Sequence, residues 1–398
     1  MAIENGPKNR YSAYGVPSLD ITFADKKSLI DRISGNNLIT FTRASAGTYV
    51  GSDGLIKTAA VNEPRFDHNP LTRESLGLLV EEARTNLLQR SGQIGTSPWG
   101  IRINAGNSAT VEQNSLLAPD GTLSATKVTI TRINNDFSGI YQDISSVTGN
   151  YTFSAWMRLG DGVSDKNLQF YSDNAIGNRI NVTLTSAWQR LTVTFTGGTY
   201  TSIGVGNWYS SLPSNWIDST PFYIWGAQLE AGAYPTSYIP TTTATVTRAA
   251  DVASITGTNF SSWYNTNAGT TFFDARVKTP AGSFSHGFLS QESTGHFRCG
   301  INGNNWYAWT TNVGGISDLG SGGGVIDGRN RGIFSYDKSI PILAQSFNGN
   351  AVGSLAGRTP VSPTNVPLVY SPGSVQVSRL TYYPTRLPDT TLQALTKL

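Results

Sequence analysis

The chain has 398 residues, which is too many for one ordinary core and about right for two to three domains of roughly 100 to 200 residues each. Charged residues make up 14% of the chain, against about 25% in an average soluble protein, while 42 glycines and frequent Ser, Thr and Asn indicate many polar turns. A hydrophobic content of 38% at a net charge of +3 excludes a disordered chain, so the composition predicts an all-β protein with packed cores.

Charge and cysteine content narrow the possible partners. The 29 Lys and Arg nearly cancel the 26 Asp and Glu, and basic residues form no long block, so nucleic acid is not an expected partner. The one cysteine, Cys299, forms no internal disulfide, and with three histidines it hardly supplies a tetrahedral zinc site. No apolar run approaches the ~18 residues of a membrane span and the start is polar, so we expect no membrane partner and no classical secretion signal.

Residues 1–88 combine one short helix with strand-sized segments. DKKSLIDRIS, residues 25–34, carries apolar residues at helical spacing and ends before Gly35, which predicts an amphipathic helix with a glycine C-cap. The segment GSDG predicts a tight hairpin turn between two strands. GLLVEEARTNLL favours a strand because Gly77 would interrupt a helix, although a helix on its leucine spacing stays open.

Residues 89–248 alternate with period two. In YTFSAWMRL, Phe153 and Met157 would point to one face of a strand, and Trp156 and Arg158 to the other. WQRLTVTFTG and FYIWGAQLE alternate in the same way, and strand-like segments recur about every 8 to 15 residues without a long helical stretch. This pattern predicts a jelly-roll β-sandwich and argues against a βαβ fold.

A second β-sandwich is expected over residues 249–398. Residues 233–257 contain two prolines and a threonine run, which predicts an extended connector before it. Strand candidates follow in TTFFDARVKT, RGIFSYDK and SVQVSRLTYYP. In the closing segment PDTTLQALTKL, Asp389 is expected to cap a short helix that packs Leu392 and Leu395 on the sheet.

Two groups of segments resemble known β-sandwich families. PDGTLSATKV, YTFSAWMR, AWQRLTVTFT and FYIWGAQLE together resemble carbohydrate-binding modules of the cellulose- and xylan-binding jelly-roll type. SVQVSRLTYYPTRLPDTTLQAL resembles the closing strand and helix of concanavalin A-like and laminin-G-like sandwiches. The resemblance implies a carbohydrate-binding-module-like fold for residues 89–248 and a concanavalin A/laminin-G-like fold for residues 249–398.

A third group resembles tailed-bacteriophage virion proteins of the head-spike, head-fibre or tail-fibre type. Its segments are GAQLEAGAYPTSYIPTTTATVTRAADV, LITFTRASAGTYVGSDGLIKTAAVNEPRFDHNP and GLLVEEARTNLL. The resemblance implies a protein of the particle surface, made in the host cytoplasm, which decorates the particle or contacts the host. It further implies that residues 1–88 attach to other virion proteins, and a homotrimer is expected by analogy.

Sugar binding requires flat apolar surfaces for stacking, and amide or guanidinium groups for hydrogen bonds to hydroxyls. We expect Trp156, Arg158, Gln169 and Gln228 to line one groove on the non-core face of the middle module, provided that their strands share that face. The alternative for Trp156 is packing under a loop or against a neighbouring subunit.

Loop aromatics form a second candidate site. Tyr141 and Trp208 lie among Gly, Asn and Ser, where side chains are usually exposed and where binding residues tend to occur. The alternative is that such aromatics close the open ends of the sandwich.

Catalysis is not expected. A glycosidase on this kind of sandwich would usually present alternating carboxylates along one strand, whereas Glu81 and Glu82 are adjacent and would point to opposite faces. A structural Ca2+ at Asp120 and Gly121 is possible because hard cations prefer oxygen ligands, with a simple Asx turn as the alternative. No other cofactor is expected.

Two arginines share the context Thr-Arg-Ala, Arg43 and Arg248. We expect each to pair with a carboxylate such as Glu63, Asp67 or Asp251 and so to fix the register between domains. The shared context is too short to indicate an internal repeat.

The sequence therefore predicts a bacteriophage virion protein, a head fibre, decoration or tail-fibre subunit, whose sandwiches bind a host-surface glycan. A purely architectural decoration protein without sugar binding is the main alternative. A polysaccharide depolymerase is the least favoured, because the carboxylate pattern is missing.

Overall fold

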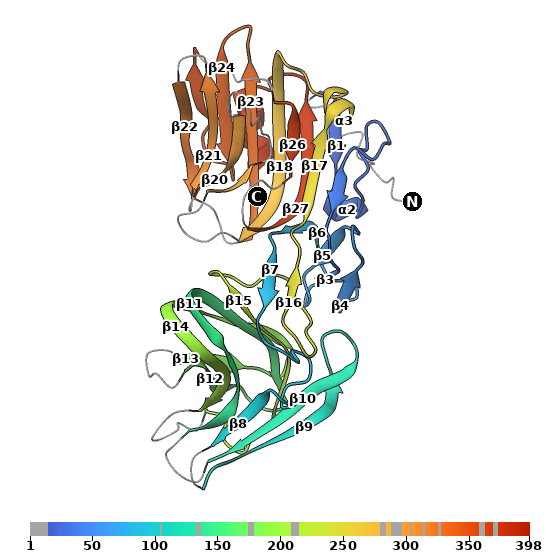
Figure 1. Ribbon diagram of the computed structural model, residues 1–398. Coiled ribbons are helices and arrows are strands. Elements are labelled where there is room, and N and C mark those ends of the chain that lie inside the picture. Colours follow the sequence, from blue (N-terminus) through green and yellow to red (C-terminus); the bar gives the residue numbers. More distant parts are fainter. Residues whose placement is uncertain are drawn as a thin grey trace. The chain divides into compact units, whose positions relative to one another are not determined.

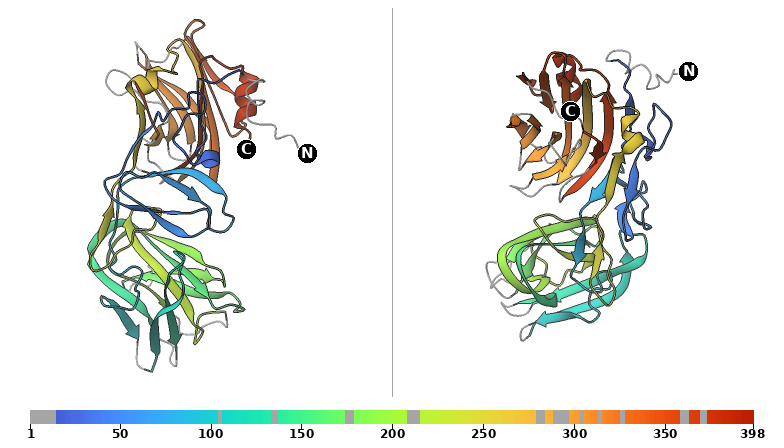
Figure 2. Two further views of the ribbon diagram at one scale, coloured as in Figure 1. Left: turned by 90° about the vertical axis from the view of Figure 1, so that its right-hand side faces the viewer. Right: turned by 45° about the horizontal axis from the view of Figure 1, so that its top comes forward.

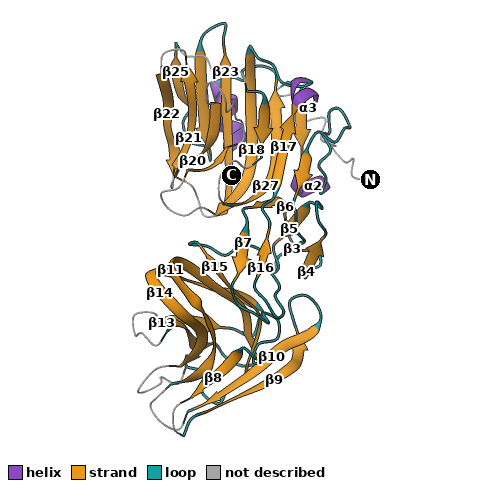
Figure 3. Ribbon diagram, viewed as in Figure 1, coloured by secondary structure: helices purple, strands orange, loops and turns teal. Residues whose placement is uncertain are grey.

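The computed structural model forms two compact units, both built from antiparallel β-sheets with few short helices (Figures 1 and 3). Unit 1 consists of Met1–Gly54, Ala59–Glu82 and Ala249–Leu398, and unit 2 of Leu55–Thr58 and Ala83–Arg248. The structure describes the chain from residue 15 onward except at 104–105, 133–136, 174–178, 208–214, 279–283, 288–296, 303–304, 313–314, 325–327, 358–362 and 369–372, and within 278–327 it describes the backbone alone. The predicted all-β fold class is confirmed.

Unit 1 is built around an eight-stranded sheet with the order β25-β24-β23-β18-β27-β6-β5, in which β1 also pairs with β27. The strands of this sheet are β1 (Leu19–Ile21), β5 (Arg65–His68), β6 (Ser75–Glu81), β18 (Ala268–Lys278), β23 (Gly328–Asp337), β24 (Ile342–Phe347), β25 (Gly353–Ala356) and β27 (Ser374–Tyr383). A three-stranded sheet consists of β2 (Thr40–Thr42), β17 (Val252–Thr256) and β26 (Asn365–Pro367). A four-stranded sheet consists of β19 (Phe284–Gly287), β20 (Phe297–Asn302), β21 (Asn305–Asn312) and β22 (Gly315–Gly324). The remaining elements of unit 1 are β3 (Gly47–Val50), α2 (Phe23–Lys26), α3 (Gly257–Ser261) and α4 (Asp389–Thr396). Strand β4 (Ile56–Ala59) falls mostly within Leu55–Thr58 and so belongs to unit 2.

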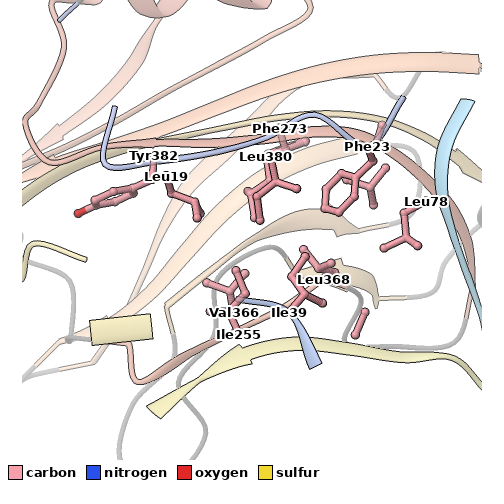
Figure 4. Packing of buried hydrophobic residues seen from close by; sticks show 14 of the residues in the cluster. Leu19, Phe23, Ile39, Leu78, Ile255, Phe273, Val366, Leu368, Leu380 and Tyr382 are labelled. Atoms are coloured by element: carbon pink, nitrogen blue, oxygen red, sulfur yellow. The ribbon is translucent and has the colours of Figure 1, made fainter. Parts of the chain in front are cut away.

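The main core of unit 1 lies between the eight-stranded and three-stranded sheets, as Figure 4 shows from close by. Along β18, Phe273, Ala275 and Val277 alternate into this core, which is the period-two pattern of a strand with one buried face. Ile255 and Val366 reach it from the opposite sheet. The two sheets therefore form a β-sandwich.

The other face of the large sheet receives the C-terminal helix. Leu392 is fully buried and Leu395 partly buried against Phe272 and its neighbours, so the predicted docking of this helix is confirmed. The predicted cap is wrong, because Pro388 takes the N-cap position and the Asp389 carboxylate pairs with an arginine side chain. No helix among the described residues is long and apolar enough to cross a membrane.

A buried ion-pair cluster joins three chain segments of unit 1. Arg43 Nη1 lies 3.0 Å from Asp251 Oδ1, and Arg65 pairs both with Asp251 and, at 2.9 Å, with Glu81 Oε2. The backbone N–H of Glu81 also donates to Asp251 Oδ2 at 2.8 Å. The predicted pairing of Arg43 with a carboxylate is thus confirmed, whereas that of Arg248 stays a prediction.

Unit 2 is a second eight-stranded sheet folded on itself, with the order β13-β12-β14-β11-β15-β10-β9 and β8 paired with β11. Its strands are β8 (Trp99–Ile103), β9 (Ser108–Leu117), β10 (Leu123–Thr131), β11 (Ser138–Leu159), β12 (Lys166–Ser172), β13 (Arg179–Leu184), β14 (Gln189–Asn207) and β15 (Phe222–Ala231). A two-stranded ribbon of β7 (Arg84–Asn86) and β16 (Val246–Arg248) brings the two ends of residues 83–248 together.

The strands β11 and β14 connect the layers of unit 2. They span 22 and 19 residues and pair along their length, with irregularities after Asp143 and at Gly149, where φ is +121°. The first part of β11 also pairs with β8 and the later part with β15, and Figure 2 shows the resulting curvature. Phe153 and Met157 are fully buried in the enclosed core, which confirms the predicted alternation.

Residues 1–88 do not form a separate structural unit, so the boundary predicted after residue 88 is wrong. Strand β6 pairs with β27 through partners such as Leu79 and Gln376, and β1 pairs with β27 as well, so the N-terminal strands belong to the C-terminal sandwich. Residues 83–248 are an insertion between β6 and β17. Pairing between strands some 300 residues apart leaves no local signal in the sequence.

The predicted helix over residues 25–34 is also wrong, because α2 ends at Lys26. Lys27 adopts a left-handed conformation with φ +49°, which stops the helix. The Asp31 carboxylate then accepts the backbone N–H groups of Ile33 and Ser34 at 3.2 and 2.8 Å, which favours a turn over a helix. The predicted turn at GSDG and the strand interpretation of GLLVEEARTNLL are confirmed.

Candidate functional site

The first predicted sugar-binding residue, Trp156, lies in a small apolar cluster of unit 2. Its side chain is 7% exposed and packs with Trp225 and Tyr238, whose ring centroids are 4.7 Å apart. An indole so enclosed offers no face to a sugar ring. The structure thus matches the packing alternative for this residue.

Gln228 is fully buried and fixes the loop that follows β15. Its Oε1 accepts the N–H of Ile239 at 2.6 Å, and its Nε2 donates to the Ser237 carbonyl at 3.3 Å and to Glu230. Glu230 in turn accepts the backbone N–H of Thr236 at 2.6 Å, and burial raises the pKa of its carboxyl. The segment predicted as an extended connector therefore begins as a loop held against β15, and Gln228 has no free amide for a ligand.

The side chain of Arg158 is also paired with groups close to it in the sequence. Its Nε donates to the Leu159 carbonyl at 2.9 Å, and its guanidinium pairs with Asp161, leaving 15% of the side chain exposed. Trp156, Arg158 and Gln228 do not share one open groove. Their strands do share a sheet, as predicted, but the three side chains make contacts within unit 2.

The structure brings Tyr141 and Gln169 onto one face of unit 2, across five adjacent strands. One cross-strand row contains Arg179, Tyr171, Gly204, Tyr141 and Gly100, and the next row contains Asn181, Gln169, Gly206, Gly139 and Arg102. These ten residues are called the tyrosine–glycine face below. Because residues two apart on a strand point to the same side, both rows share this face, opposite the apolar core.

Glycines allow aromatic rings to lie against the backbone of this face. A Cβ at Gly204 would lie 2.6 Å from Cζ of Tyr171, and one at Gly100 would lie 2.8 Å from Cε1 of Tyr141. A Cβ at Gly206 would lie 2.8 Å from the ring of Phe137. Such contacts are shorter than van der Waals separation, so the flat placement of the rings requires glycine here.

The two tyrosines differ in exposure. Tyr171 is fully buried, its hydroxyl donates to the Ile140 carbonyl at 3.3 Å, and burial raises its pKa far above the ordinary tyrosine value. Tyr141 is half-buried, and the Arg102 guanidinium carbon lies 4.1 Å from its ring centroid. Tyr141 and Arg102 therefore form a partly exposed cation–π pair.

Amides complete the face on its other side. Gln169 is buried, and its Nε2 donates to Oδ1 of the exposed Asn181 at 3.2 Å. Asn181 thus has an oriented amide at the surface. The face offers an aromatic ring, a guanidinium and an amide, which are the groups that recognise sugars.

Sequence reasoning named two members of this face, Tyr141 and Gln169, and missed Arg102 and Asn181. The alternating glycines Gly204 and Gly206 in SIGVGN were the available signal, because glycine at every second residue marks one strand face. The third predicted aromatic, Trp208, lies outside the described residues.

Metal and catalytic candidates find little support in the structure. Asp120 Oδ1 accepts the backbone N–H of Thr122 at 2.9 Å and its hydroxyl at 2.7 Å, which is the Asx-turn alternative. In the described part of the chain, no group of three or more His, Cys, Asp or Glu side chains could hold a metal ion. Glu81 belongs to the buried ion-pair cluster of unit 1 and serves packing.

No family model matches the chain, and no curated protein matches it. Among solved structures, it is similar to the CBM40 of the Ruminococcus gnavus IT-sialidase bound to α2,3-sialyllactose, at 18% identity and TM-score 0.27 over 33% of this chain and 84% of that chain. The family 11 carbohydrate-binding module of Clostridium thermocellum, in complex with a mixed-linked tetrasaccharide, is similar at 15% identity and TM-score 0.27 over 38% and 98%. The CBM2 module of the evolved Dit of Lactobacillus casei BL23 phage J-1 is similar at 11% identity and TM-score 0.24 over 34% and 69%.

Proposed function

We propose that unit 2 is a non-catalytic glycan-binding module in a protein of the phage virion surface, and that it binds through the tyrosine–glycine face. The observation that carries the proposal is the partly exposed Tyr141–Arg102 pair on the same sheet face as the amide that Gln169 orients on Asn181. The four side chains stand on β8, β11, β12 and β13 of one sheet, with the glycines of β14 between β11 and β12, so the backbone sets their spacing.

The side chains of the tyrosine–glycine face suit the binding of an uncharged polysaccharide. The ring of Tyr141 supplies apolar surface for the C–H face of a pyranose, while Arg102 and Asn181 supply planar donors and an acceptor for its hydroxyls. A single site of this kind binds a sugar weakly. Many copies on one particle would raise the apparent affinity through avidity.

The virion part of the proposal rests on the resemblance of segments of the sequence to phage virion proteins. Residues that carry this resemblance, such as Arg43 and Gln228, are packing residues in the structure. Attachment to other virion proteins, a homotrimeric assembly and a location on the particle surface remain predictions, which binding of the purified chain to fibre-stripped particles and its mass in solution would test.

The glycan proposal is tested with the full chain on a glycan array, followed by titration of the best ligand. We expect Tyr141→Ala to weaken binding about tenfold, which is about 1.4 kcal/mol, because the stacking surface is lost. Tyr223→Ala is the matched control, since Tyr223 is also half-buried in unit 2 but lies on β15. Thermal unfolding of each variant shows that the fold is intact.

A purely architectural role is the second candidate. It is favoured by the complete burial of Tyr171 and Phe137 on the same face, which shows that much of the aromatic surface is used within the chain. A folded wild-type chain that binds no glycan but binds stripped particles would support this role and contradict the glycan proposal.

A further inference from the structure

Unit 1 has an open pocket beside the edge of its three-stranded sheet. The pocket has a volume of about 470 Å³, within the range of about 300–1,000 Å³ that is usual for ligand sites. Its apolar wall is formed by Leu29, Ile30, Ile39, Phe41, Pro64 and Phe66. Ile30 is 48% exposed, whereas Ile39 and Phe41 belong to the main core of unit 1. The pocket therefore presents an apolar surface that the core holds in place.

The wall of the pocket includes part of a strand edge. Strand β2 is the outermost strand of its sheet, next to β17. The carbonyl of Ala253 on β17 accepts the Leu368 N–H at 2.9 Å, so Ala253 turns its backbone groups toward β26. Ala253 stands opposite Phe41 in the ladder, and backbone groups alternate in direction along a strand. The N–H and C=O of Phe41 therefore point away from β17, to the outer edge of β2.

The backbone groups on either side of Phe41 are paired along this edge. Arg43 donates its N–H to Asn62 Oδ1 at 2.9 Å and accepts the Asn62 N–H at its carbonyl at 3.0 Å. Asn62 holds this position in a left-handed conformation, with φ +61°. In the other direction, the Ile39 N–H donates to Asn37 Oδ1 at 3.1 Å. Between these contacts, the N–H and C=O of Phe41 have no partner among the described residues.

The polar side chains that line the pocket supply hydrogen-bond donors. The amide oxygens of Asn37 and Asn62 accept backbone N–H groups, which leaves their Nδ2 groups without a partner in the part of the chain that the structure describes. Lys27 is the one charged residue of the lining, and its exposed ammonium group forms no ion pair with any described residue. Acceptor oxygens, above all those of a carboxylate, would complement these donors.

The open backbone groups of Phe41 distinguish between two kinds of occupant. A small organic acid would satisfy the donors of the pocket but would leave the Phe41 carbonyl without a hydrogen bond. A residue of an extended peptide has both an N–H and a C=O, so it can pair with Phe41 as a strand residue does. The same peptide can place an apolar side chain against the wall and a carboxylate near Lys27. These observations favour a peptide.

We propose that this pocket is a docking site for an extended, acidic segment of a partner protein. The segment adds a short strand to the outer edge of β2, with an apolar residue paired with Phe41 and an acidic residue at Lys27. The proposal goes beyond the glycan site of unit 2 and does not depend on it.

The test begins with selection of random peptides of about seven residues, with blocked ends, on the full chain. We expect enrichment of peptides that combine an apolar residue with Asp or Glu. The best peptide is then titrated against Ile30→Asp, which should weaken binding about tenfold because it places a charge on the apolar wall. Ile33→Asp is the matched control, since Ile33 is 41% exposed and is not part of the lining.

The charge contact has a separate test. Lys27→Gln should weaken peptide binding by about twofold to fivefold, because a surface ion pair is lost, whereas Lys26→Gln should have no effect. The difference between wild type and Lys27→Gln should disappear when the acidic residue of the peptide is replaced by its amide.

Strand pairing has its own readout. In the full chain labelled with ¹⁵N-phenylalanine, the Phe41 amide proton should exchange about tenfold more slowly when the peptide is bound, because it gains a hydrogen-bond partner. Methylation of the peptide nitrogens one at a time should identify one position at which binding falls about tenfold, since one peptide N–H donates to the Phe41 carbonyl. These two measurements also test the proposal in the event that Ile30→Asp does not fold.

Several outcomes would overturn the proposal. Selection that enriches no peptide, or equal binding to the wild type and to Ile30→Asp, would show that the pocket takes no peptide. Equally tight, competing binding of decanoate would assign the pocket to a small acid. A chain that is dimeric in solution and monomeric as Ile30→Asp would assign it to a second copy. Tyr141→Ala should leave peptide binding unchanged, so this proposal and the proposed function fail separately.

Discussion

The two units bury polar side chains in different ways. Unit 1 encloses charged groups, with Arg43, Arg65, Glu81 and Asp251 all at most 2% exposed at the side chain. Unit 2 also buries Glu230 and Arg248, but amides satisfy many of its buried backbone groups, such as Asn86, whose Nδ2 donates to two backbone carbonyls and whose Oδ1 accepts two backbone N–H groups. The charged groups of unit 1 come from three distant segments, so each is paired only when all three segments assemble. The amide of Asn86 instead pairs with backbone groups of neighbouring strands. Unit 1 should therefore be the more sensitive to loss of a single polar group.

The largest effect is expected from Asp251→Asn in unit 1. Loss of this carboxylate leaves Arg43 and part of the Arg65 charge buried without their anion, so the free energy of unfolding should fall by about 3–5 kcal/mol. Urea unfolding, followed by hydrogen exchange of peptides from each unit, would show the loss in unit 1. Asp389→Asn breaks an ion pair whose carboxylate is 50% exposed and should cost less than about 1 kcal/mol. Equal effects of the two variants would contradict the role of burial.

A smaller loss is expected from Asn86→Ala in unit 2. The change leaves buried carbonyls of Ala227 and Ile239 and two N–H groups without this partner, which should cost about 2–4 kcal/mol. Asn150→Ala is the control, because Asn150 is exposed and its side chain accepts one hydrogen bond, from the Gly197 N–H. Hydrogen exchange should show faster opening of β15 in the first variant only. Protection of β15 as in the wild type would contradict this role of the Asn86 amide.

The smallest effect concerns pH. Burial raises the pKa of Glu230 in the folded chain above its unfolded value of 4.5, so the folded state holds the proton more tightly than the unfolded state. The stability of unit 2 should therefore fall as pH rises from about 4.5 through the folded pKa, and Glu230→Gln should remove this slope. Glu112→Gln, at a carboxylate that is 67% exposed, should retain it. Urea midpoints between pH 4 and pH 8 provide the measurement, and a slope that persists in Glu230→Gln would contradict the assignment.

Much of the fold follows from local pattern. The alternation of Phe153 and Met157, the turn at GSDG and the docking of Leu392 were all visible in the sequence, because each depends on residues a few positions apart. The helix predicted over residues 25–34 is absent, and here too the cause lies in residues a few positions apart. Its apolar spacing was helical, but the Asp31 carboxylate competes for the backbone N–H groups through local hydrogen bonds.

The candidate site was less predictable. Alternation placed Trp156 correctly on the non-core face of β11, but whether that face is open depends on Trp225 and Tyr238, which lie far along the chain. Gln228 was predicted to face a ligand for the same reason. Its amide instead holds the loop after β15, and the alternation of residues along a strand does not show that this loop folds back. The pairing of Arg102 with Tyr141 needs the register between β8 and β11, which single-strand patterns do not contain.

The all-β class and the strand periodicity follow from composition and two-residue alternation, which act within each strand, and the sequence likewise shows no strong catalytic pattern. That the N-terminal strands complete the C-terminal sandwich, with residues 83–248 as an insertion, follows from strand pairing in the folded chain. The tertiary structure also decides which aromatic and arginine side chains remain at the surface. These features depend on strand pairing across hundreds of residues, where burial is set by whichever distant segment covers a face.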